Sequence, residues 1–251
     1  VPKRQYKDKM LICGGIDYYA NVASQRTNND IVGYNNFKNK VVYITRLNGT
    51  EKEVDSIYNY KNYYTSGQNV LLKGKHATDE RFFNLIPEGF STIHIATHGY
   101  FSGKTVFNDL KPPFRDNVMS ESGLIMAGAG NNLKNKDFNP KYFDGVMTAK
   151  ELSQLNLLNT DLIILSACQT GLGTITADGV YGMQRALKTA GVKAMVLSLW
   201  SVDDAATMEF MKVFHRELKE NSSIPNKIHR AFNTARKHML YDGKIVTNKF
   251  N

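Results

Sequence analysis

Short apolar runs alternate along the chain with stretches whose apolar residues recur every three or four positions. The first pattern is typical of buried strands in a parallel sheet, and the second of helices that cover such a sheet. The run at 161–166 is the most apolar, as expected for a central strand that is covered on both faces. Strands are predicted at 10–14, 69–72, 91–97, 123–127 (a strand or one arm of a hairpin), 161–166 and 194–200.

The helical periodicity is equally clear between these runs. Phe210, Phe214 and Leu218 recur at four-residue spacing and predict a core-facing stripe. Gly191 stands where a C-terminal cap belongs, and Pro225 where a first helical turn is expected. Helices are predicted to open near Thr78 and to cover 180–190, 203–220 and 224–240, with loops or insertions at 21–39 and 102–121.

This alternation predicts an α/β fold, a three-layer sandwich with a predominantly parallel central sheet and helices on both faces. No internal repeat or long low-complexity linker interrupts it, so residues 1–251 are expected to form a single domain. The chain begins with Val1 rather than Met, and we expect it to be a piece of a longer protein.

Composition places the chain among globular proteins that do not cross a membrane. Hydrophobic residues make up 42% and charged residues 22% of its 251 residues, which excludes a disordered chain. No apolar run approaches the roughly 18 residues that a membrane span needs, and no secretory signal follows the basic start. The two cysteines, Cys13 and Cys168, are too few for a disulfide framework, so a cytoplasmic location is expected.

The formal net charge of +9 raises the question of an acidic partner. Residues 1–10 carry a surplus of +3 and residues 212–251 a surplus of +6, while the residues between them sum to zero. Nucleic-acid binding would gather basic residues on one face, interleaved with aromatic residues. Two basic ends on a neutral body therefore do not favour direct nucleic-acid binding, which remains an alternative only.

Familiar metal and nucleotide motifs are missing from the sequence. It contains no CxxC pair, no HExxH, no complete phosphate loop or dinucleotide fingerprint, and no nucleophile elbow. We therefore expect neither a metal site nor a cofactor.

Two strand ends carry the remaining candidate chemistry. His98 follows the strand predicted at 91–97, and Cys168 follows the strand predicted at 161–166. Glycine-bearing loops come next in both cases, so both side chains are expected at the carboxyl edge of the sheet, where open α/β sheets bind ligands. A cysteine and a histidine from neighbouring strands can form a thiol nucleophile and its proton-transfer partner.

Structural roles compete with this catalytic hypothesis. A cysteine after an apolar strand is often a small buried hydrophobe, and a histidine at a strand end is often only hydrogen-bonded. The two together leave the physical argument evenly balanced. Cys13 has no comparable neighbourhood and is predicted to pack in the core, and His94, inside its strand, is predicted to be a satisfied core histidine.

Seven longer segments carry a further signal, and they occur in the order 47–54, 93–99, 122–128, 147–152, 165–173, 179–187 and 198–204. Together they resemble the CHAT domain, a caspase-like peptidase module often found at the C-terminal end of bacterial tetratricopeptide-repeat proteins. The resemblance covers nearly the whole chain and implies the caspase-like version of the sandwich. The segment at 47–54 resembles the one that precedes the family's first helix.

The resemblance assigns roles to particular residues. It implies a cysteine endopeptidase in which Cys168 attacks a peptide carbonyl and His98 protonates the leaving amine. The backbone N–H groups of Gly99 and Cys168 would form the oxyanion hole. A protein or peptide is the implied substrate, and a repeat or sensor region, upstream or in trans, the implied regulator.

The resemblance to separases, a related family, also places acidic residues where a basic P1 side chain would bind. Asp203 and Asp204 are candidates for this pocket, although an aspartate at the start of the helix predicted at 203–220 is equally suited to capping it. One of the two can cap while the other faces the pocket. Asp178 is a further candidate, and Trp200 either lines the substrate groove or packs in the core.

Two further expectations follow from the family. A catalytically silent caspase-like module used for protein interaction is the alternative function, although both candidate catalytic residues are present. The loop at 102–121 is a place for activating rearrangement or self-cleavage, with Lys104, Lys111 and Arg115 as basic sites.

Overall fold

The computed structural model describes residues 9–22, 44–60, 69–101, 119, 122–132, 143–167, 173–176, 179–198, 203–220 and 225–241. A five-stranded parallel sheet with the order β10-β7-β3-β1-β2 forms the centre of the fold. The predicted α/β class is confirmed. These strands are β1 (Met10–Ile16), β2 (Val70–Gly74), β3 (Thr92–Ala96), β7 (Leu162–Ser166) and β10 (Ala194–Leu197).

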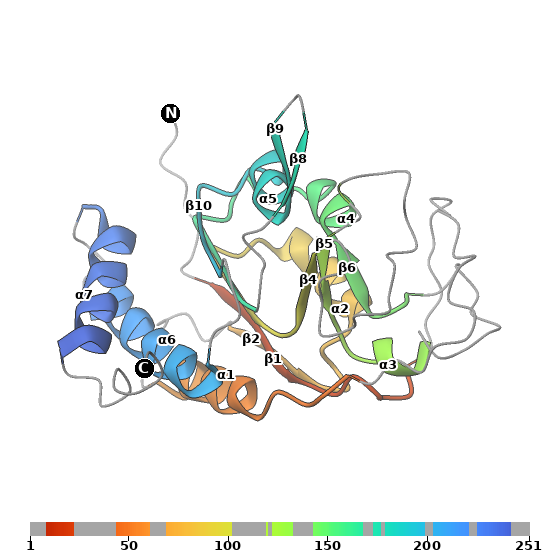
Figure 1. Ribbon diagram of the computed structural model, residues 1–251, viewed down its shortest axis with the longest axis horizontal. Coiled ribbons are helices and arrows are strands. Elements are labelled where there is room, and N and C mark those ends of the chain that lie inside the picture. Colours follow the sequence, from red (N-terminus) through yellow and green to blue (C-terminus); the bar gives the residue numbers. More distant parts are fainter. Residues whose placement is uncertain are drawn as a thin grey trace, which may run out of the picture.

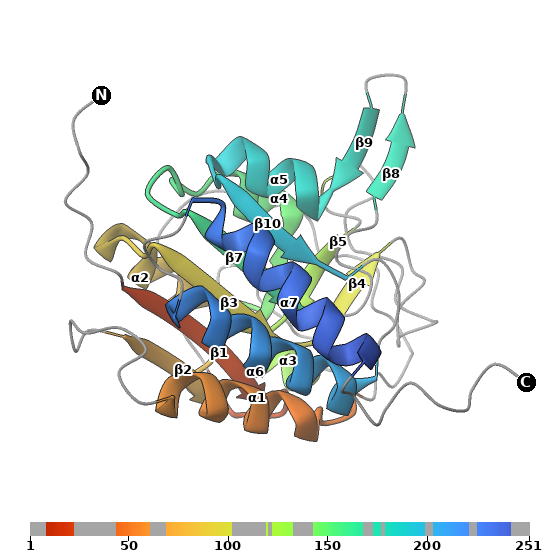
Figure 2. The ribbon, with the colours of Figure 1, turned by 90° about the vertical axis from the view of Figure 1, so that its left-hand side faces the viewer.

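Two smaller antiparallel units accompany this sheet. The first is a three-stranded sheet with the order β4-β5-β6, and the second is the hairpin of β8 and β9, which projects from the body in Figures 1 and 2. The strands are β4 (Gly99–Phe101), β5 (Ser122–Ile125), β6 (Val146–Thr148), β8 (Gly173–Thr176) and β9 (Gly179–Gly182).

Helices cover both faces of the central sheet, as predicted. In Figure 1, α1, α6 and α7 lie along one side of the sheet, and α4 and α5 lie on the other. The helices are α1 (Asn48–Asn59), α2 (Asp79–Leu85), α3 (Ala129–Asn132), α4 (Ala149–Ser153), α5 (Met183–Ala190), α6 (Asp204–Glu220) and α7 (Lys227–Tyr241), with a 3-10 turn at Ile86–Glu88.

The strands divide their side chains between two cores because successive residues point to opposite faces. In β7, Ile163 and Leu165 join the large core on the α2, α4 and α5 side, whereas Leu162 and Ile164 pack with α6 and α7. All four are at most 2% exposed. A strand buried on both faces reads as a continuous apolar run, which is why β7 was the strongest strand prediction. It lies one place from the middle of the sheet, and β3 is the middle strand.

Two helices begin three residues later than predicted. The helix expected at 180–190 begins at Met183, because residues up to Gly182 pair with β8 in the hairpin. Val180 and Tyr181 are good strand formers, and their periodicity was read as helical. The last helix begins at Lys227, so Pro225 lies in the turn before it. Phe232 of this helix is 38% exposed, and its ring contacts that of Phe210 at 5.3 Å between centroids.

The segment at 47–54 lies largely within α1, not before the first helix as expected. The buried residues of α1, which are Thr50, Glu53, Val54 and Ile57, follow the spacing of one helical face. That face packs against β1 and carries polar groups to the carboxyl edge of the sheet. The loops predicted at 21–39 and 102–121, with Lys104, Lys111 and Arg115, lie outside the described residues, apart from the two ends Asn21–Val22 and Met119.

Candidate active site

The carboxyl ends of β3 and β7 lie side by side in the central sheet. Ala96 is paired with Ser166, and the Thr97 backbone N–H donates to the Ser166 carbonyl at 3.2 Å. His98 follows directly, between β3 and β4, and Gly99 opens β4. The predicted edge is therefore the one where His98 lies. Cys168, two positions beyond the end of β7, lies outside the described residues, as do Asp178 and Trp200.

The imidazole of His98 is fixed by a backbone carbonyl. Its Nε2 lies 2.7 Å from the Thr45 carbonyl oxygen. A carbonyl can only accept, so Nε2 carries the hydrogen and Nδ1 is the acceptor nitrogen of the neutral ring. The residue is 4% exposed, and burial lowers the pKa of His98, against the opposing influence of the Thr45 carbonyl and the Asp204 charge. His98 is therefore a neutral imidazole with a defined tautomer at pH 7.

Tyr18, just beyond β1, packs beside this imidazole. The two ring centroids are 5.2 Å apart, and the Tyr18 hydroxyl lies 3.2 Å from Thr97 Oγ1. Thr97 Oγ1 donates to the Ile125 carbonyl at 2.5 Å, so the Tyr18 hydroxyl is the donor to Thr97. Burial raises the pKa of Tyr18, which keeps that hydroxyl protonated. Tyr18 thus restrains both the ring of His98 and the backbone before it.

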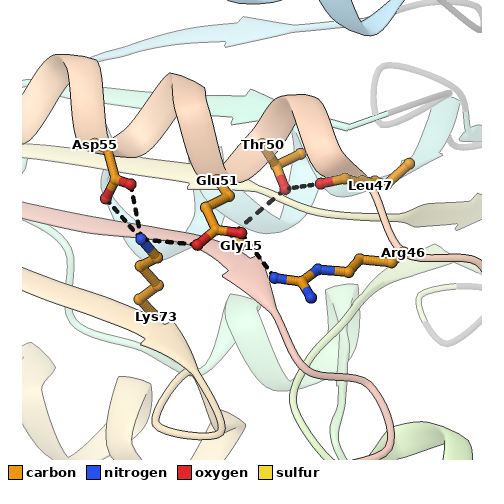
Figure 3. Close-up of polar contacts among 7 residues, drawn as sticks. All are labelled: Gly15, Arg46, Leu47, Thr50, Glu51, Asp55 and Lys73. Carbon is orange, nitrogen blue, oxygen red and sulfur yellow. Dashed lines mark hydrogen bonds and ion pairs between the residues drawn. The ribbon is translucent and has the colours of Figure 1, made fainter.

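The segment that supplies the Thr45 carbonyl is anchored where α1 begins. Thr50 Oγ1 donates to the Leu47 carbonyl at 2.8 Å and accepts from the Gly15 N–H at 3.3 Å (Figure 3). Gly15 has a φ of +58°, and a Cβ there would lie 3.0 Å from Glu51 Cβ. A side chain at position 15 would therefore be strained and would push α1 away from β1.

Charged side chains reinforce the same contact from the outside. Lys73 Nζ lies between Glu51 Oε1 at 3.0 Å and Asp55 Oδ2 at 2.7 Å, and Arg46 contacts Glu51 at 2.7 Å (Figure 3). The hydrogen bond to Asp55, then that to Glu51, raises the pKa of Lys73, while the hydrogen bond from Lys73 is the largest influence that lowers the pKa of Glu51. Because the cluster is partly exposed, each pair contributes at most about 1 kcal/mol.

A cavity of about 30 Å³ lies beside these strand ends, between α1 and the start of α6. This volume has room for one or two water molecules. Its walls carry two carboxylates, those of Glu53 and Asp204, together with several hydroxyl groups. The lining residues are Leu47, Thr50, Glu53, Thr97, Ser166, Ala167, Asp204 and Thr207.

Asp203 and Asp204 differ in what they contact. Asp203 Oδ1 accepts from the backbone N–H groups of Ala205 and Ala206, each at 3.0 Å, which is the geometry of a helix N-cap. Asp204 is exposed and lines the cavity. Desolvation raises the pKa of Asp204, and the neighbouring Asp203 charge adds to this. One aspartate therefore caps α6, while the other faces the cavity.

Sequence reasoning missed three residues around His98. Tyr18 follows β1 at the carboxyl edge of the sheet, so its position could be predicted from the sequence, but its contact with the His98 ring could not. Glu53 had the helical spacing described above as its signal. Thr45 acts through its backbone and leaves no signal in the sequence. Cys13 is fully buried in the large core, and burial raises its pKa to about 12, so its packing role is confirmed.

Within the described ranges, no cluster of three His, Cys, Asp or Glu side chains is arranged to hold a metal ion. No helix in that part of the chain has the length and apolar character needed to cross a membrane.

Solved structures show where this architecture occurs. The Arg-specific cysteine proteinase gingipain R superposes with a TM-score of 0.51 at 12% sequence identity, over 94% of this chain and 44% of the gingipain chain. At this identity the likeness concerns the fold alone. The chain has the caspase-like fold of that proteinase.

Curated relatives include tetratricopeptide repeat protein 28 of Mus musculus and that of Homo sapiens. Each is 29% identical over 159 residues, which are 59% of this chain and 6% of the relative. The chain thus spans a small fraction of the relatives it matches. The family model described as CHAT domain matches residues 16–249. The chain therefore belongs to the CHAT domain family.

Proposed function

We propose that this chain is a cysteine endopeptidase domain that cleaves a protein substrate, with Cys168 as the nucleophile and His98 as its proton-transfer partner. The observation that carries the proposal is the hydrogen bond from His98 Nε2 to the Thr45 carbonyl. It directs the lone pair of a buried, neutral imidazole to Nδ1, just beyond the end of β3, which is paired with the strand that leads to Cys168. Any hydrogen-bonded histidine has a fixed tautomer, and what favours a catalytic role here is the position of this imidazole at the carboxyl edge of the sheet, beside the end of β7.

The chemistry follows from this tautomer. His98 Nδ1 takes the thiol proton of Cys168, and the thiolate attacks the peptide carbonyl carbon. The Gly99 and Cys168 N–H groups donate to the oxyanion that forms. The C–N bond then breaks as His98 protonates the leaving amine, and a water molecule hydrolyses the thioester and restores the thiol. The Thr45 carbonyl keeps Nε2 protonated and stabilises the imidazolium that exists between the two transfers.

The exposed carboxylate of Asp204 supports a preference for a basic P1 residue, although the cavity of about 30 Å³ beside it is too small to hold such a side chain. Asp204 presents this carboxylate on the cavity wall, and burial together with Asp203 raises the pKa of Asp204, so a cation there would relieve unfavourable charge. Asp203 is already engaged as a cap. Asp178 and Trp200 remain sequence-based candidates for the same pocket.

The curated relatives are tetratricopeptide repeat proteins, and this supports a regulatory repeat region outside this chain. In this proposal residues 1–251 form the peptidase domain of a longer, cytoplasmic protein, and the repeat region controls access to its substrate.

The test compares cleavage of a peptide library by wild type, Cys168→Ala and His98→Ala. Cys13→Ala serves as the matched control, because it removes the other, buried thiol. We expect Cys168→Ala to abolish cleavage, His98→Ala to lower kcat at least about 100-fold and Cys13→Ala to retain it. Equal cleavage by wild type and Cys168→Ala would refute the proposal. Failure of a thiol-reactive peptide inhibitor to label wild type would instead favour an interaction module.

A further inference from the structure

A chain of buried polar side chains crosses the interior on the α1 and α6 side of the sheet. Glu53 of α1 accepts through Oε1 from His94 Nε2 of β3 at 2.8 Å and through Oε2 from Ser166 Oγ of β7 at 3.2 Å. His94 Nδ1 in turn lies 3.1 Å from His215 Nε2 of α6. Glu53, His94 and His215 are at most 1% exposed, and Ser166 is 5% exposed.

All the hydrogen bonds among these buried side chains can be oriented so that each donor points toward the Glu53 carboxylate. Burial, and then the neighbouring His94, lower the pKa of His215 well below its usual range, so His215 is neutral. A neutral His215 can donate through Nε2 to His94 Nδ1, while His94 Nε2 and the Ser166 hydroxyl donate to Glu53. Both carboxylate oxygens are then satisfied.

Stability alone does not account for such a cluster. Replacing a buried ionic or polar group by packed apolar residues is often neutral or stabilising, because the desolvation cost is avoided. On the face of the sheet where His94 lies, its neighbours are apolar. Ile164 is its partner in β7 and packs in the same core as Phe214. A buried carboxylate contributes little net stability even when it is hydrogen-bonded, so its presence in this apolar setting points to a role other than stability.

The Glu53 carboxylate binds at the end of β7. Ser166 is the last residue of the strand, and its carbonyl accepts the Thr97 N–H one residue before His98. Its side chain is bound by Glu53, so Ser166 is held from two directions. The stretch of chain that leads into α1, and so to Glu53, also supplies the Thr45 carbonyl to His98. One segment, Thr45 to Glu53, therefore contacts both strands that lead to the proposed catalytic residues.

We propose that Glu53 is a positioning residue of the peptidase reaction. Its carboxylate fixes Ser166, and thereby the direction in which the chain leaves β7 toward Cys168, relative to the His98 that the same segment orients. His94 and His215 hold the carboxylate in place and connect it to α6. This inference rests on the proposed function, since it assigns to Glu53 the placement of that nucleophile.

Three substitutions test this role. Glu53→Ala removes both contacts, and Ser166→Ala removes only the contact to β7 and leaves the Glu53–His94 pair intact. Glu53→Gln retains an acceptor for His94 and a donor toward Ser166 Oγ. Lys52→Ala is the matched control, because Lys52 is an exposed, charged neighbour of Glu53 on the same helix.

The measurements are kcat and KM for a cleaved peptide, the rate of Cys168 alkylation by iodoacetamide, and the melting temperature. We expect kcat to fall at least about tenfold in Glu53→Ala and about fivefold in Ser166→Ala, with KM within about threefold of wild type. We expect Glu53→Gln to recover most of the loss and Lys52→Ala to behave as wild type. Alkylation of Cys168 should slow in the order of the kcat losses.

Folded Glu53→Ala and Ser166→Ala proteins with wild-type kcat and wild-type alkylation rates would overturn the role of Glu53. A loss of kcat in Ser166→Ala that only follows the unfolded fraction would overturn it too. If wild type cleaves no peptide, the proposed function fails, and the alkylation rates still decide: equal rates in wild type, Glu53→Ala and Ser166→Ala would refute positioning.

Discussion

The adjacent residues Asp203 and Asp204 offer a sharp test of the proposed P1 preference, because their carboxylates make different contacts in this structure. Asp203 binds two backbone N–H groups at the start of α6, whereas Asp204 lines the cavity. Asp204→Asn removes one charge from the cavity wall without changing the size of the side chain. Asp203→Ala removes the helix cap and leaves the cavity charge in place.

The magnitude follows from Coulomb attraction between Asp204 and a P1 guanidinium. At about 4 Å this attraction is worth roughly 1 kcal/mol in water and roughly 4 kcal/mol at a protein surface. Asp204 is exposed, so we expect the lower part of that range, about 1–2 kcal/mol. Asp204→Asn should therefore lower the ratio of kcat/KM for P1 Arg over P1 norleucine about 5- to 30-fold. The effect should shrink at high salt.

Asp203→Ala should give the opposite result. Loss of an N-cap costs about 1 kcal/mol, measured as the free energy of unfolding in urea. The P1 ratio should stay within about twofold of wild type. A P1 ratio that is unchanged in Asp204→Asn, or that falls equally in both variants, would refute the assignment of Asp204 to the P1 pocket.

Three further predictions follow from burial and capping. Burial lowers the pKa of His215 below its ordinary 6.5, so the unfolded chain binds a proton first as the pH falls. The free energy of unfolding should then decrease below about pH 6.5 by up to about 1.4 kcal/mol per pH unit. Urea titrations at several pH values should show a shallower dependence of this free energy on pH in His215→Gln, and an equal dependence in wild type and variant would contradict this account. Burial raises the pKa of Cys13 to about 12, so mass spectrometry should find iodoacetamide on Cys168 in the native protein and on Cys13 only after denaturation. Thr148 and Glu151 form a capping box on α4. Thr148→Ala should therefore lower the free energy of unfolding by about 1 kcal/mol. An unchanged urea midpoint would disprove this contribution of the cap.

The sequence was informative where side-chain pattern alone decides structure. The apolar runs located all five strands of the central sheet, because strands of a parallel sheet that is covered by helices are rich in apolar residues. The cap at Gly191, with a φ of +98°, was also predictable, because few residues other than glycine adopt that conformation. The expectation that an aspartate caps α6 agrees with the geometry of Asp203, while the role of Asp204 in a P1 pocket stays a prediction.

Contacts that depend on tertiary structure were out of reach. The acceptor of His98 is a backbone carbonyl, which any residue at position 45 would supply. The antiparallel sheet of β4, β5 and β6 joins short strands from distant parts of the chain, and only β5 is long enough to stand out as an apolar run. The partnership of Glu53 with Ser166 joins residues that no local spacing relates.

The pairing of β3 with β7 also has a consequence for how activity is acquired during folding. These strands are adjacent in the sheet but far apart in the chain, and such a contact forms late because a long loop must close first. Helices α6 and α7, which contact each other locally, can form well before that pair does. In the proposed mechanism the thiol and its base therefore meet only once the central sheet is assembled. A nascent or partly unfolded chain would contain the reactive residues but could not cut its neighbours.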